Sequence, residues 1–135
     1  MELTVNGTVQ EGGVSDEAIA EAIQSLTGDV DSFAILAASE MSYIQTAGDP
    51  GTGFDLEYQN GSLKEHYYCT SGPLTAKQVV DAFQRYAKGD DRWQKDLGWK
   101  REDLAVPASP VPLKTVVVVA GLVVLLVAWW FSRSA

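Results

Sequence analysis

The sequence predicts an α+β domain, in which a four-stranded antiparallel meander carries two helices packed on one face, followed by one C-terminal transmembrane helix. Three observations lead to this prediction. Short apolar runs of strand length, separated by turn residues, fill residues 33–69. Two longer stretches, residues 16–26 and 76–88, carry apolar side chains at helical spacing. Residues 115–131 are uncharged and contain no proline, which is typical of a membrane span.

The N-terminal region contains a hairpin signal and a helix start. Asn6-Gly7 supplies the two residues with positive φ that a type I′ turn needs, between short strands at residues 3–5 and 8–10. Ser15 precedes the first helical stretch as an N-cap, and Gly28 follows as a stop. We therefore expect a small hairpin and then a helix.

The middle of the chain reads as strands. Residues 33–38 are almost all apolar, which indicates a strand covered on both faces. Residues 43–47 form the next predicted strand, and the glycine-rich stretch 48–53 connects it to the following one. This stretch lacks the lysine of a phosphate-binding loop, so we interpret it as a strand connection.

Residues 54–67 give the clearest local signal, because Asn60-Gly61 divides two alternating runs. A two-residue turn predicts a definite register, with Asp55 opposite His66 and Glu57 opposite Lys64. The apolar side chains then share the core face. The other face is predicted to be solvated, and its residues are the candidates for a binding surface: Asp55, Glu57, Lys64, His66 and Tyr68.

The second helix has a doubly marked start. Thr75 and Gln78 have the spacing of a capping box, and Gly89 ends the helical pattern. The acidic pair at residues 90–91 is expected to cap a short helical turn, which places Trp93 on the core. An exposed tryptophan that anchors a partner is the alternative interpretation.

The C-terminal region is predicted to anchor the chain in a lipid bilayer. Residues 1–104 form the acidic domain, residues 105–112 a proline-rich spacer, residues 113–131 the span and residues 132–135 a short polar tail. Lys114 at the near end, with Trp129 and Trp130 at the far end, are the expected interfacial anchors. This order predicts a tail-anchored, single-pass protein in the bacterial cytoplasmic (inner) membrane. The acidic domain is expected in the cytosol, because no secretory signal is visible and basic residues are more frequent on the domain side of the span.

Charge and composition exclude several classes of function. The chain has 18 acidic and 10 basic residues, and two of the basic residues, Lys114 and Arg133, flank the uncharged run 115–131. The domain therefore carries a net charge of −10, which is incompatible with charge-driven binding of nucleic acid. With one cysteine, Cys69, and one histidine, we expect neither a metal site nor a bound cofactor. Cys69 is interpreted as a small core residue.

One cluster suggests catalysis. Asp55 opposite His66 is a carboxylate–imidazole pair, in which the carboxylate orients the ring. An ordinary solvated cross-strand pair is the alternative that we favour, because no nucleophile is expected on that face. We therefore do not expect an enzyme, and a minor enzymatic interpretation centred on these two residues stays open.

Residues 42–93 resemble a pattern found in small bacterial proteins without an assigned activity. In that pattern an EYQxGS hairpin precedes an LTxxxVVxAFxxYxxGD helix, which here are EYQNGS at residues 57–62 and LTAKQVVDAFQRYAKGD at residues 74–90. The resemblance implies a compact α+β domain and no catalytic residues. The arrangement is also loosely similar to immunity proteins that neutralise bacterial toxins.

These observations lead to one expected function, which is a non-enzymatic module that binds a protein partner through its acidic surface. The charge of this surface favours a basic partner. A toxin-immunity protein at the inner membrane is the sharper alternative, because a negative field attracts a basic toxin. A structural tether without a dedicated ligand is a third interpretation.

Overall fold

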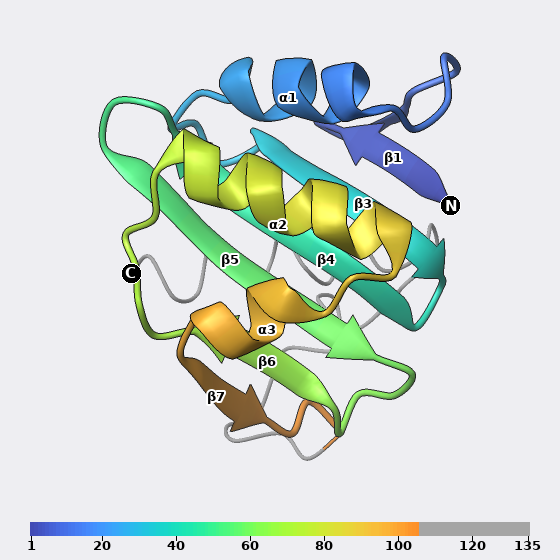
Figure 1. Ribbon diagram of the computed structural model, residues 1–135, viewed down its shortest axis with the longest axis vertical. Helices are drawn as coiled ribbons and strands as arrows, with labels where there is room; N and C mark the ends of the chain where they lie inside the picture. Colours follow the sequence, from blue (N-terminus) through green and yellow to red (C-terminus); the bar gives the residue numbers. More distant parts are fainter. Residues whose placement is uncertain (106–135) are drawn as a thin grey trace.

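The computed structural model describes residues 1–105, which form a seven-stranded antiparallel sheet and three helices (Figure 1). The strand order in the sheet is β2-β1-β3-β4-β5-β6-β7. In chain order the elements are β1 Glu2–Val5, β2 Thr8–Val9, α1 Asp16–Gln24, β3 Phe33–Ser39, β4 Ser42–Asp49, β5 Gly53–Asn60, β6 His66–Cys69, α2 Ala76–Lys88, α3 Arg92–Asp96 and β7 Trp99–Glu102.

The predicted four-stranded meander with two helices is wrong, because both ends of the domain add strands to the sheet. The N-terminal hairpin joins through β1, where Leu3 pairs with Leu36 of β3. At the other end, β7 pairs with β6 after the short helix α3. Each added strand satisfies backbone groups at a sheet edge that a four-stranded sheet would leave open, and β1 also buries Leu3.

The predicted transmembrane helix, residues 113–131, lies outside the described residues. Within residues 1–105, no helix is both long and apolar enough to span a membrane.

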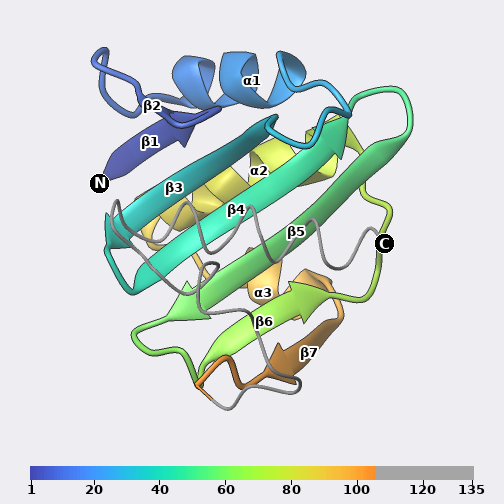
Figure 2. The ribbon, with the colours of Figure 1, turned by 180° about the vertical axis from the view of Figure 1, so that it is seen from behind.

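All three helices lie on one face of the sheet (Figures 1 and 2). The main core fills the space between them and the central strands. Its buried members include Ile19 and Ile23 of α1, Leu36 of β3, and Val79 and Phe83 of α2, none of which is more than 1% exposed. Within residues 1–105, the helices therefore cover one face of the sheet and bury its apolar side chains.

The local signals at the helix starts are confirmed. The Ser15 hydroxyl accepts a hydrogen bond from the Ala18 backbone N–H at 3.0 Å. Thr75 and Gln78 form both bonds of the capping box, which satisfies backbone donors at the start of α2. Gly89 ends α2 with a φ of 72°, a left-handed conformation that glycine adopts without strain.

The two Asn-Gly pairs behave differently. Asn6 and Gly7 have φ values of 51° and 86°, and they form the predicted two-residue turn between β1 and β2. At the second pair only Gly61 has a positive φ, and the Gly61 backbone N–H donates to Met41 O in the β3–β4 turn. The chain therefore forms a longer loop between Asn60 and His66, closed by a 2.9 Å bond from Asn60 N to Glu65 O.

The longer loop makes the predicted hairpin register wrong. His66 lies opposite Gln59, and Glu57 lies opposite Tyr68, so β6 is displaced by four positions relative to the prediction. Because four is an even number, each β6 side chain keeps its predicted face and only its neighbours change.

Candidate functional site

The sheet face opposite the three helices carries the candidate site. Within residues 1–105 no helix lies on this face, so we call it the helix-free face. Cross-strand pairing places two rows of side chains along it, because directly paired residues point to the same side. One row is Thr4, Ile35, Gln45, Glu57, Tyr68 and Lys100, and the next is Glu2, Ala37, Tyr43, Gln59, His66 and Glu102. Phe33, Ala47 and Asp55 form a third, shorter row.

One part of this face is apolar. Phe33, Ile35 and Tyr43 form a cluster, and Ala37 and Ala47 pack against it. Phe33 and Ile35 alternate along β3 with Ala34 and Leu36, which contribute to the main core on the other face. The prediction that this strand is buried on both faces is therefore confirmed.

Beside the apolar cluster lies a polar network of buried side chains. Gln45 Nε2 donates a 2.8 Å hydrogen bond to Glu57 Oε2, and both residues are at most 1% exposed. His66 Nε2 lies 3.9 Å from the other oxygen of the same carboxylate, Glu57 Oε1. The buried carboxylate of Glu57 on β5 thus lies between one side chain from β4 and one from β6.

Gln59 connects the network to the aromatic residue of the apolar cluster. Tyr43 Oη donates to Gln59 Oε1 at 3.1 Å, and Gln59 Nε2 donates to Met41 O at 3.2 Å. His66 Nδ1 lies 3.2 Å from the same Gln59 oxygen. Because an amide oxygen only accepts, this geometry places a proton on Nδ1 of His66 and turns Nε2 toward Glu57.

Burial and the nearby carboxylate affect the tyrosine. Tyr43 is 1% exposed, and its burial, followed by the negative charge of Glu57, raises the pKa of its hydroxyl well above the ordinary value. Tyr43 therefore remains a neutral donor to Gln59 over the whole physiological pH range. The network is fixed by directional bonds that an apolar core lacks.

The five predicted surface residues have different environments. Glu57 and His66 are both 0% exposed, so the expectation that they are solvated is wrong. Tyr68 is half-buried, whereas Asp55 and Lys64 are exposed. Lys64 lies in the loop between β5 and β6, and its carbonyl accepts a 2.9 Å bond from Arg101.

The predicted Asp55–His66 pair is not formed. His66 lies opposite Gln59, four residues further along β5 than Asp55, which corresponds to roughly 13 Å at strand spacing. Glu57 is the carboxylate near His66 instead. The enzymatic interpretation therefore lacks the pair on which it depends.

Sequence reasoning missed Tyr43, Gln45 and Gln59 as members of this site. The available signal is their alternation, because these residues share one face of their strands with Glu57. Two glutamines that point to the same side of adjacent strands indicate a polar network wherever that side of the sheet is buried.

Cys69 and Trp93 both contribute to the main core between the sheet and the helices, as predicted. Trp93 is 4% exposed in the main core, and Cys69 packs against that core. Tyr58 stacks on Tyr67 with ring centroids 4.7 Å apart and meets Trp93 edge-on at 5.0 Å. Burial, more than the nearby Tyr67 and Glu65, raises the pKa of Tyr58 to about 12. These aromatic rings close the core.

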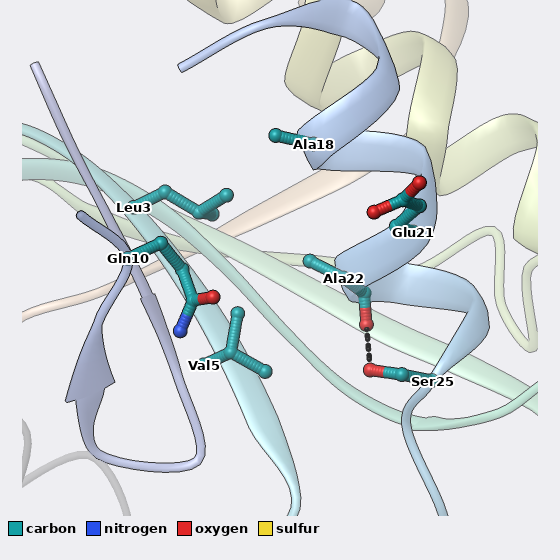
Figure 3. A pocket seen from close by; sticks show the side chains of 7 residues that line it. All are labelled: Leu3, Val5, Gln10, Ala18, Glu21, Ala22 and Ser25. Carbon is teal, nitrogen blue, oxygen red and sulfur yellow. Dashed lines mark hydrogen bonds between the residues drawn. The ribbon is translucent and has the colours of Figure 1, made fainter. Parts of the chain in front are cut away.

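The remaining surface features are less suited to binding. A groove of about 260 Å³ lies between the N-terminal hairpin and α1, with Leu3, Val5 and Gln10 on one side and Ala18, Ala22 and Glu21 on the other (Figure 3). This volume is below that of a usual ligand pocket. Within residues 1–105, no group of three or more metal-ligating side chains is close enough to hold an ion.

The glycine-rich loop is organised by its own aspartate. Asp49 accepts hydrogen bonds from the backbone N–H groups of Gly51 and Thr52 at 2.8 and 2.9 Å. The Thr52 side chain and backbone bonds lower the pKa of the Asp49 carboxyl. The amides that a phosphate would need are thus already satisfied, which agrees with the interpretation as a strand connection.

The expected membrane anchors, Lys114, Trp129 and Trp130, lie outside the described residues. Comparison of the chain with protein families, curated proteins and solved structures gives no match. The resemblance to small bacterial α+β proteins and to immunity proteins therefore stays an expectation.

Proposed function

We propose that this protein is a membrane-anchored, non-enzymatic interaction module, and that its protein partner binds the helix-free face of the sheet. One observation supports the proposal above the others. All three described helices pack on one side, while the other side carries an aromatic and aliphatic cluster next to a polar network. Apolar anchors beside directional polar groups are typical of protein interfaces.

The charge of the domain supports a basic partner. The described residues contain all 18 acidic side chains and only eight of the ten basic ones. A net charge of −10 speeds the encounter with a positively charged protein and disfavours acidic competitors. A basic toxin that is neutralised at the inner membrane is one partner of this kind, as in the immunity interpretation.

The hydropathy of residues 113–131 supports the membrane anchor. As a helix, the 17 uncharged residues from 115 to 131 would be about 25 Å long, close to the thickness of the hydrocarbon layer. Attachment to a membrane raises the effective concentration of the domain near other membrane-bound proteins. The proposed topology places the domain in the cytosol.

The anchor is tested by alkaline carbonate extraction of membranes that contain the full chain. We expect the unchanged protein to stay in the pellet. The double variant Val123→Arg/Leu126→Arg is expected to move to the supernatant, because each arginine disfavours insertion by about 3 kcal/mol. Release of the unchanged chain by carbonate would overturn the anchor.

The binding face is tested by charge reversal in the full chain, purified with its bound proteins from mildly solubilised membranes. Asp55→Lys reverses an exposed charge on the helix-free face, and Asp81→Lys is the matched control on α2. We expect Asp55→Lys to reduce the amount of a stoichiometric basic partner at least tenfold and Asp81→Lys to leave it unchanged. Equal recovery with both variants contradicts the assignment of the face.

A further inference from the structure

The acidic excess of the domain comes from one part of the chain. Residues 1–63 contain 11 acidic residues and no lysine or arginine, whereas residues 64–105 contain 7 acidic and 8 basic residues. Residues 1–63 form strands β1 to β5 and helix α1. The sheet order places β6 and β7, which follow them, at the edge opposite to the N-terminal hairpin. The hairpin and α1 therefore lie in a strongly negative part of the domain.

Helix α1 carries more negative charge than its own stability requires. Asp16 and Glu17 lie in the first turn, where carboxylates interact favourably with the helix dipole. Glu21 lies one turn further along, next to Glu17 on the helix surface, and the two like charges repel each other. Lys88 of α2 contacts Asp16 at 2.9 Å, but within residues 1–105 no cation forms an ion pair with Glu17 or Glu21. Both carboxylates are exposed, so a cation from another molecule can reach them.

The groove between α1 and the N-terminal hairpin has an apolar lining beside Glu21 (Figure 3). Leu3 and Val5 of β1 lie on one side, and Ala18 and Ala22 of α1 lie on the other. The two alanines are four residues apart and share one face of the helix, where their short side chains leave the space open. The volume of about 260 Å³ is below that of a usual small-molecule pocket, and it suits a single long side chain.

The polar side chains around the groove offer hydrogen-bond acceptors. Ser25 Oγ donates its proton to Ala22 O at 2.7 Å. Gln10 Nε2 donates to Thr8 O at 2.9 Å, and its Oε1 is an acceptor. Glu21 lies on the opposite side of the groove from Gln10, and its carboxylate only accepts (Figure 3). An apolar channel with acceptors on both sides matches arginine, which has an aliphatic stem and a planar guanidinium with five N–H donors.

We propose that this groove binds an arginine side chain of a basic protein partner, with the stem between Val5 and Ala18 and the guanidinium at Glu21. The negative charge of residues 1–63 attracts the partner. The groove prefers arginine to lysine, because an ammonium group lacks the planar fork that can serve two acceptors. The inference goes beyond the proposed function, since the groove lies beside α1 on the helix side of the sheet. It depends neither on the helix-free face nor on the membrane anchor.

The test is an NMR titration of the full chain in nonionic detergent, with isotope-labelled methyl groups in alanine, leucine and valine. The probes are two blocked pentapeptides of equal charge, acetyl-GKRKG-amide and acetyl-GKKKG-amide. We expect the arginine peptide to shift the methyl signals of Val5, Ala18 and Ala22, and to bind at least fivefold more tightly than the lysine peptide. Shifts confined to other methyl groups, or equal affinities of the two peptides, overturn the proposal.

Three variants separate the groove from the general charge of the domain. Glu21→Gln removes the carboxylate with little change of shape, and Ala18→Leu fills the groove but keeps the charge. Each is expected to weaken binding of the arginine peptide at least fivefold. Glu40→Gln removes an equal charge at an exposed position between β3 and β4, outside the groove, and should change the affinity less than twofold.

The methyl signals of Leu36, in the main core, show whether each variant is folded. Glu21 is exposed, so Glu21→Gln tests the proposal even if Ala18→Leu disturbs the packing of α1. An equal loss of affinity in Glu21→Gln and Glu40→Gln overturns the proposal, because the peptide then responds to net charge alone.

Discussion

Gln59 lies directly opposite His66 across strands β5 and β6, and its side-chain oxygen is 3.2 Å from Nδ1 of the histidine. The same oxygen accepts a hydrogen bond from the hydroxyl of Tyr43 on β4. A single amide thus joins three adjacent strands on the helix-free face.

Gln45→Leu is expected to destabilise the domain by about 1–3 kcal/mol, because it removes a hydrogen bond to the buried Glu57 carboxylate. The free energy of unfolding from urea titrations measures the effect. Gln10→Leu, at an exposed glutamine, is the matched control and should change stability by less than about 0.5 kcal/mol. Equal effects in the two variants contradict a role for the network in stability.

Thr75→Ala is expected to cost about 1 kcal/mol, since it removes one half of the capping box at the start of α2. Thermal unfolding followed by circular dichroism is the measurement. Thr8→Ala, in the two-residue strand β2, removes an exposed threonine that caps no helix. A loss as large for Thr8→Ala as for Thr75→Ala argues against the cap as the cause.

Gly48→Ala is expected to destabilise the protein by at least about 2 kcal/mol. The φ of Gly48 is +134°, and an added Cβ would lie 2.3 Å from the backbone oxygen of Gly53. Gly61 also has a positive φ, +84°, but no atom lies within 4 Å of an added Cβ. Gly61→Ala should therefore cost only about 1 kcal/mol, the penalty of the left-handed conformation alone. The free energies of unfolding of both variants, from chemical denaturation, show whether the contact between the added Cβ at position 48 and Gly53 O lowers stability.

Asp90→Asn is expected to reduce the loss of stability in acid. Hydrogen bonds from Arg92, with a further one from Arg85, lower the pKa of the Asp90 carboxyl well below its ordinary value. A carboxyl group with a lowered folded-state pKa stabilises the fold above its unfolded-state pKa, near 3.8, and this contribution is lost as the pH falls below that value.

Urea titrations at about pH 6 and about pH 3 measure this difference. The unchanged protein should lose more stability between the two pH values than Asp90→Asn does. Asp31→Asn, at an exposed loop position, is the control. An identical pH dependence for Asp90→Asn and the unchanged protein means that the Arg92 and Arg85 contacts do not act on folding.

Local signals in the sequence predicted several elements correctly. Ser15, Thr75 and Gly89 mark helix ends where the structure has them, because capping depends on residues within one turn. The turn at Asn6-Gly7 was also predictable. The same dipeptide at Asn60-Gly61 led to a wrong register. The hydrogen bond from Gly61 N to Met41 O joins a distant part of the chain, which no local pattern reveals.

In the candidate site, too, the face of a side chain was predictable from the sequence, but its neighbours were not. The face assignment of Glu57 and His66 survives the wrong register, because the displacement is even. Their neighbours, Gln45 and Gln59, depend on which strands pair and in which register. The number of strands also escaped prediction, because the pairing of β1 with β3 joins residues that are 29 to 35 positions apart.

The two edges of the sheet bear on how the molecule associates with others. At one side the sheet ends in β2, two residues long, and at the other in β7, four residues long with Lys100 and Arg101 exposed. Such short or charged margins offer an incoming strand too few free backbone groups for stable addition. Both margins thereby disfavour polymerisation of the domain into fibres through strand addition.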